Sequence, residues 1–149
     1  MMNSERKILV FELGTEKYAI DIARVERILG YAKPTGLPDS DKFVEGVIDY
    51  ETGVLPVINL CTKFNMPGKQ VGSQTKIVVI KEEDFKIGII VDAVYEVIDV
   101  SQESIDDVPA ITKVNSRTYI SGLLKRDKSI VILLDILKIF SDDEKQKLR

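Results

Sequence analysis

The residues best suited to chemistry in this sequence are few: one cysteine, two pairs of adjacent aspartates, and no histidine. Without histidine, the chain lacks the most common general base and the most common metal ligand. Cys61 has no histidine to activate it as a nucleophile, so a buried apolar role is favoured. We therefore predict no catalytic residue, no metal site and no cofactor, and a protein that is not an enzyme.

The two aspartate pairs are interpreted as solvated carboxylates. Asp106 and Asp107 lie in a polar stretch, while Asp142 and Asp143 lie in the first turn of a short helix predicted at the C-terminus. Acidic side chains in a first helical turn are stabilised by the helix dipole. The turn GTEK at 14–17 lacks the glycine and lysine pattern of a phosphate-binding loop, so no such loop is expected.

Composition indicates a globular protein that acts through its surface. Of the 149 residues, 44% are hydrophobic but only 7% are aromatic, so the core must be aliphatic. The net charge of −3 and the scattered basic residues argue against nucleic acid as a partner. A single cysteine fits a reducing compartment, and the longest apolar stretches have strand length. We expect a cytoplasmic protein with no signal peptide and no direct membrane insertion.

An internal repeat predicts the elements that carry these residues. The segment 7–29 lies without gaps over 76–98, and 46–64 resembles 122–140. Both copies read as strand, turn, strand, apolar-faced segment and hairpin. The predicted domain covers 1–149 and consists of a first repeat at 7–64, a linker at 65–75, a second repeat at 76–140 and a helical tail at 141–149.

The repeated strands predict an all-β fold of two small closed or nearly closed barrels, because closure removes exposed sheet edges. Barrels of this size have thin cores, so they should pack on each other or exchange a strand. Within the first copy, Asp21 is expected to cap a short helix at 22–29. Near the C-terminus, Asp135 is predicted to cap a short segment, and Ser141 with Glu144 fits a capping box.

Four stretches resemble the CheW-like domain family in the same order. They are LVFELGTEKYAIDIARV at 9–25, FVEGVIDYETGVLPVINL at 43–60, GIIVDAVYEVIDV at 88–100 and GLLKRDKSIVILLDILKI at 122–139. The resemblance implies two packed five-stranded SH3-like barrels. It also implies a bacterial chemotaxis adaptor, monomeric when free, that binds the cytoplasmic tips of chemoreceptors and the regulatory domain of the histidine kinase CheA. Such an adaptor is recruited to membrane-associated receptor arrays.

Two alternatives stay open at this point. One is a small-barrel domain that binds another ligand, either a small molecule or nucleic acid. The other is a CheW-like module that serves a kinase pathway outside chemotaxis. A pocket with convergent polar groups, or a basic face with aromatic platforms, would favour the first alternative.

Two charges depart from the family's pattern: Arg27 stands where many relatives have glutamate, and Glu51 stands where they have arginine. The inversions are either two independent changes or an ion pair whose direction is reversed. An exposed ion pair contributes only about 0–1 kcal/mol to stability, so its expected role is to fix a loop or to set partner choice.

The resemblance also suggests a receptor-binding groove, lined by Val25, Ile28, Leu29, Ile48, Tyr50, Gly88 and Val94. Each apolar member has barrel core as its alternative role. For Val25 and Val94, which occupy the same position in the repeat, core and groove are equally plausible. Gly46 is expected to serve backbone geometry at the start of a strand, although a bulky side chain there could also block a partner.

Overall fold

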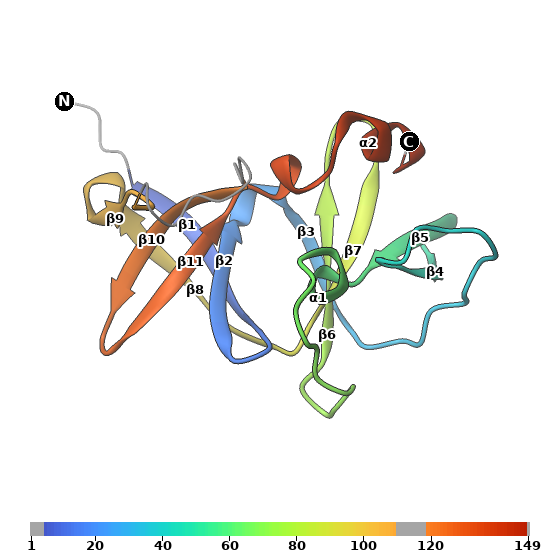
Figure 1. Cartoon of the computed structure of the whole chain (residues 1–149), viewed down its shortest axis with the longest axis horizontal. Helices are drawn as coiled ribbons and strands as arrows, with labels where there is room; N and C mark the ends of the chain where they lie inside the picture. Colours follow the sequence, from blue (N-terminus) through green and yellow to red (C-terminus); the bar gives the residue numbers. More distant parts are fainter. Residues whose placement is uncertain (1–4, 110–118, 149) are drawn as a thin grey trace.

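The computed structural model describes residues 5–109 and 119–148 of the chain. Its strands form two curved sheets that lie side by side, with the C-terminal helix above the junction and the second sheet (Figure 1). One sheet has six strands, in the order β8 (Ala93–Ser101), β1 (Glu5–Leu13), β2 (Glu16–Asp21), β11 (Ser129–Leu134), β10 (Ile120–Arg126) and β9 (Ile105–Asp106). The other has five, in the order β3 (Val25–Gly30), β6 (Lys76–Lys81), β7 (Lys86–Val91), β5 (Gly53–Ile58) and β4 (Val44–Tyr50).

Within the described residues, five short helices connect or follow these strands. Three are 3-10 helices and two are α-helices: η1 (Ile22–Arg24), α1 (Leu60–Lys63), η2 (Gln102–Ser104), η4 (Ile136–Ile139) and α2 (Asp142–Leu148). The predicted 65–75 linker is tied to the sheets, because Lys69 pairs with Glu12 of β1 at 2.6 Å. Part of the connection predicted at 101–118 lies outside the described residues.

The prediction of two packed, closed or nearly closed five-stranded barrels is confirmed only in part: the fold is mostly β with two sheets, but these have six and five strands and do not close. Among the described residues, the ladders leave β8 and β9 at the edges of one sheet and β3 and β4 at the edges of the other. The segments that could close each sheet pair over too few residues. In the six-stranded sheet, β9 has only two residues. In the five-stranded sheet, the chain between β3 and β4 pairs with β4 through a single bridge, Thr35 to Val47. Side-chain packing, not a continuous ladder, fills the remaining gap.

The two copies of the repeat exchange strands. From the first copy, β1 and β2 join the sheet of β8, β10 and β11, and from the second copy, β6 and β7 join the sheet of β3, β4 and β5. The exchange needs two parallel contacts, β2 with β11 and β5 with β7. Each copy therefore contributes to both sheets.

The exchanged strands are buried on both faces, and this creates three cores. In β1, Leu9 and Phe11 face a central core between the sheets, while Ile8 and Val10 face the interior of the six-stranded sheet. In β6, Val78 and Ile80 face the same central core, while Ile77 and Val79 face the interior of the five-stranded sheet. Side chains alternate along a strand, so a continuous apolar run fills both cores at once.

The hairpins of the two copies coincide at a shift of 76 positions. The strands β4 and β5 with α1 have the bounds of β10 and β11 with η4 under that shift. Glu51 and Asp127, which turn the two hairpins, both have positive φ, at 52° and 55°. The side chains of Asn59 and Asp135 cap the helix that follows each hairpin, as predicted for Asp135.

The helix predicted at 22–29 is mostly strand. Only η1 is helical, and Asp21 caps it as expected by accepting a hydrogen bond from the Ala23 amide. From Val25 onward the chain pairs with β6, starting opposite Ile80. The β-branched and apolar residues of this segment gain more from pairing along a buried strand than from a solvated helix.

The C-terminal tail forms the predicted capping box. The Ser141 hydroxyl accepts a hydrogen bond from the Glu144 amide, and Glu144 accepts one from the Ser141 amide. Glu144 also pairs with Lys63 of α1 at 2.6 Å. Burial opposes ionisation of this carboxyl, yet the hydrogen bonds from Lys63 and Ser141 hold the pKa of Glu144 below its usual value.

Candidate functional site

Five side chains from three parts of the five-stranded sheet meet at one end of it. Tyr50 ends β4, Glu51 turns the hairpin, Glu26 and Arg27 lie on β3, and Lys86 begins β7. We call this group the Tyr50 cluster. It contains both of the inverted charges that the sequence singled out.

A chain of polar contacts joins the cluster. The Tyr50 hydroxyl donates to Glu26 at 2.6 Å. The Lys86 ammonium lies 3.0 Å from Glu26 and 3.2 Å from Glu51. The Arg27 guanidinium lies over the Tyr50 ring, 5.7 Å from its centroid. These contacts connect the two edge strands of the sheet where the ladder leaves them unpaired.

The same contacts shift the ionisation of the cluster. Hydrogen bonds from Tyr50 and Lys86 hold the pKa of Glu26 below its usual value. Burial and the hydrogen bond to Glu26 raise the pKa of Tyr50. The pKa of Lys86 is raised by its hydrogen bonds to the two glutamates. At neutral pH, Glu26 is therefore ionised, and Tyr50 and Lys86 are protonated.

A pH-dependent stability difference is expected for Glu26→Gln. Because the pKa of Glu26 is lower in the folded state, its stabilising effect is present above the unfolded pKa of about 4.3 and is lost as the pH falls through the folded pKa. The variant should therefore be less stable than the parent at pH 7, and the difference should shrink below about pH 4. Urea unfolding across this range measures it, with the exposed Glu45→Gln of β4 as control. A difference that persists unchanged at low pH would contradict the ionic role.

Arg27 and Glu51 are brought to the same cluster, but they do not pair directly among the described residues. Glu51 pairs with Lys86, and Arg27 contacts the face of Tyr50. The sequence interpretation therefore missed Lys86 as the cation of the cluster. Side chains alternate between the two faces of a strand, so Lys86 lies on the same face of β7 as Gly88. Only the order of the strands in the sheet places that face next to Tyr50.

Most residues suggested for the groove belong to the core of the five-stranded sheet. Ile48 and Tyr50 are buried there, and Leu29 packs against them. Gly88 is buried beside them, and a Cβ at this position would lie 2.7 Å from a methyl carbon of Ile77. These four positions shape the sheet from inside and contribute little to its outer surface.

The other three residues lie at the sheet edges that border the central core. Val25 of β3 and Val94 of β8 both pack, partly buried, against that core. Ile28 of β3 is 41% exposed, and Val97, which occupies the equivalent position on β8 in the repeat, is 51% exposed. An apolar strip therefore follows each of these two edge strands.

Gly46 has the backbone geometry that the sequence analysis expected. Its φ is +140°, and it lies at a bulge between β4 and β5. Thr35 bonds to Val47 in both directions at 2.9 Å, so the backbone of Thr35 approaches Gly46 closely. A Cβ there would lie 2.0 Å from the Thr35 oxygen.

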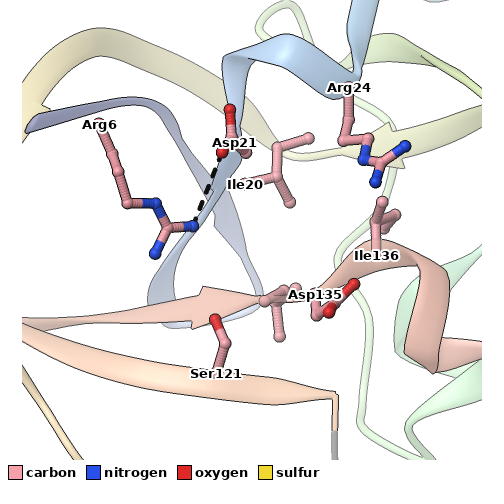
Figure 2. Close-up of a pocket in the computed structure, with 8 residues that line it drawn as sticks. Arg6, Ile20, Asp21, Arg24, Ser121, Asp135 and Ile136 are labelled. Carbon is pink, nitrogen blue, oxygen red and sulfur yellow. Dashed lines mark ion pairs between the residues drawn. The ribbon is translucent and has the colours of Figure 1, made fainter. Parts of the chain in front are cut away.

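A polar cavity of about 300 Å³ opens between the six-stranded sheet and η1. In Figure 2, Arg6 reaches toward Asp21, while Arg24 and Asp135 lie on the far wall. The Arg6–Asp21 separation is 3.7 Å, and Arg24 pairs with Glu82 at 3.3 Å. Each of the two arginines that line the cavity therefore already has a carboxylate partner.

The remaining candidate chemistry is structural. Cys61 is buried as a free thiol, and burial raises its pKa. Within 5–109 and 119–148, no group of three or more acidic, cysteine or histidine side chains could hold a metal ion. In the same residues, no helix combines the length and the apolar character needed to cross a lipid bilayer.

Comparison with known proteins yields consistent matches over nearly the full length of the chain. The CheW-like domain family matches residues 7–144. The chemotaxis protein CheW of Treponema pallidum is 34% identical over 99% of this chain and 89% of its own length. That of Klebsiella aerogenes is 32% identical over 93% of this chain and 84% of its own. The crystal structure of the scaffolding protein TtCheW from Thermoanaerobacter tengcongensis superposes with a TM-score of 0.83 at 29% identity, covering 97% of this chain and 92% of that one.

Proposed function

The chain belongs to the CheW-like domain family, and we propose that it is a chemotaxis scaffold that couples chemoreceptors to the histidine kinase CheA without catalysing a reaction. The match over 7–144 carries this proposal, because relatives similar over nearly this whole chain are named chemotaxis protein CheW. The free protein is proposed to be a cytoplasmic monomer that joins membrane-associated receptor arrays.

We place receptor binding along the edge strands β3 and β8. The exposed Ile28 supplies an apolar contact for the cytoplasmic helical tip of a receptor, and Val25 and Val94 line the floor where they meet the central core. Amphipathic helices dock into apolar grooves of this kind through residues spaced one turn apart. The buried Ile48, Tyr50 and Gly88 and the partly buried Leu29 support this strip from within the five-stranded sheet.

The Tyr50 cluster is proposed to set partner choice. Arg27 is exposed beside Ile28 on β3, while Glu51 is held by Lys86 at the hairpin turn. Charges at the rim of an interface steer partners and reject those with like charge. A receptor tip that fits this chain should therefore place an acidic group opposite Arg27.

We expect Ile28→Ser to weaken binding of a soluble receptor-tip helical hairpin about tenfold, because it removes an apolar anchor. NMR titration of the ¹⁵N-labelled chain measures the affinity, and shifts should concentrate near 25–29 and 94–97. In the same titration, Arg27→Glu should reverse the preference between hairpins with an acid and with a base opposite position 27. Ile130→Ser, an exposed residue of β11, is the control. Equal affinity of Ile28→Ser and the parent would remove receptor binding from this edge.

A further inference from the structure

A short segment that follows α1 covers one end of the central core. Residues 66–69, which we call the strap, face the turn between β1 and β2, and a largely apolar cavity of about 350 Å³ lies between them. Gly68 packs on Cys61, since a Cβ added to this glycine would lie 3.5 Å from the Cys61 Cβ and 3.9 Å from its Sγ. Cys61 is only 6% exposed. The strap is therefore part of the cover of this thiol.

Few contacts hold the strap in place. Among the residues that the structure describes, the backbone of 67–71 makes no hydrogen bond to another backbone group. At the start of the strap, the Met66 amide donates to the Cys61 carbonyl at 2.8 Å, and the Met66 sulfur accepts a weak hydrogen bond from the Tyr18 hydroxyl at 3.6 Å. Segments with so few backbone contacts open at a low free energy while the rest of the protein stays folded.

The far end of the strap is held by the side chain of Lys69. Its ammonium lies 2.6 Å from one carboxylate oxygen of Glu12 on β1. The other oxygen of Glu12 accepts a hydrogen bond from the Tyr95 hydroxyl of β8. These two hydrogen bonds hold the pKa of Glu12 below its usual value, so the carboxylate is ionised at neutral pH. A single carboxylate thus connects the strap to the edge strand β8.

Tyr95 is placed where a partner on β8 would reach it. It follows Val94 and is 47% exposed, and the Lys17 ammonium lies 4.9 Å from its ring centroid. A partner that covers this ring restricts the hydroxyl to the position in which it orients Glu12 toward Lys69. It also excludes water from the ion pair, and ion pairs are stronger in a lower dielectric. Occupation of β8 should therefore hold the strap closed.

We propose that the strap is a latch that a receptor tip on β8 holds closed, through the contacts from Tyr95 to Glu12 and from Glu12 to Lys69. The inference rests on the proposed function, because the receptor tip is the partner that would occupy β8. In the closed arrangement Gly68 covers Cys61, and in the open one Lys69 leaves Glu12 and solvent reaches the thiol. A receptor tip that binds the closed arrangement about threefold more tightly than the open one shifts the equilibrium by that factor.

The reaction of Cys61 with an aromatic disulfide measures the open fraction, since the chain has no other cysteine. Lys69→Gln should raise the rate about threefold, as expected for the loss of a partly exposed ion pair. Lys7→Gln is the matched control and should react as the parent does, because Lys7 pairs with Asp99 of β8 at 2.8 Å at the other end of β1. Low concentrations of urea separate strap opening, whose rate changes little, from global unfolding, whose rate rises steeply.

A saturating concentration of the receptor-tip hairpin should slow the reaction of the parent about threefold. Lys69→Gln and Tyr95→Phe, brought to saturation with the same hairpin, should lose this slowing. Equal rates for Lys69→Gln and the parent without hairpin, or slowing that persists in both variants, overturn the inference. If the hairpin binds the parent in the NMR titration without changing the rate, the inference fails while the proposed function stands. If the hairpin does not bind the parent, the proposed function fails and the inference fails with it.

Discussion

Gly46→Ala should lower the free energy of unfolding by about 3 kcal/mol or more, a large part of the stability of a domain of this size. The backbone at this position has a φ of +140°, which residues with a side chain rarely adopt. The added Cβ would lie 2.0 Å from the Thr35 oxygen and 2.5 Å from its carbonyl carbon. Because both atoms belong to the backbone, relief requires that the Thr35–Val47 bridge be broken.

Urea unfolding followed by circular dichroism measures this loss. Gly53→Ala, at the start of β5 in the same hairpin, is the control, since a Cβ there meets no atom within 4 Å. Its effect should stay within about 1 kcal/mol. The experiment also separates the two roles considered for Gly46. A variant of normal stability that no longer binds the receptor-tip hairpin would show that Gly46 serves the partner and not the backbone.

Phe11→Ala should cost about 3–5 kcal/mol, which is typical of removing a large buried aromatic side chain. Phe11 is 0% exposed in the central core, and its ring stacks with that of Tyr18 at a centroid distance of 6.3 Å. The central core draws residues from both sheets, including Leu134 of β11 and Ile89 of β7. A cavity at this position therefore weakens both sheets together.

Unfolding of Phe11→Ala should remain a single transition at lower urea concentration. Amide signals of Val57 in the five-stranded sheet and of Leu133 in the six-stranded sheet are expected to disappear together. Phe11→Leu, which keeps most of the apolar volume, should cost less than about 1.5 kcal/mol. Separate midpoints for the two amides would mean that the sheets unfold independently and that the central core does not join them.

The repeat, the hairpins and the caps could be predicted because they depend on residues close together in the chain. Asp21, Asp135 and Ser141 each bond to an amide within three positions, and these caps are confirmed. The segment 22–29 was predicted incorrectly because its apolar spacing fits a helix as well as a strand. Pairing with β6, about fifty positions away, decided between them.

The sequence by itself determined the β-rich class, the aliphatic core and the lack of catalytic histidine chemistry, since composition and local pattern suffice for these. The family followed from the resemblance of four stretches of the sequence to the CheW-like domain. Only the tertiary structure decided that the barrels stay open, that the copies exchange strands, and that Lys86 joins Glu26 and Glu51. Side-chain alternation assigns each residue to a face of its strand, but it does not say which strand lies alongside. That depends on long-range pairing, and the Tyr50 cluster arises from it.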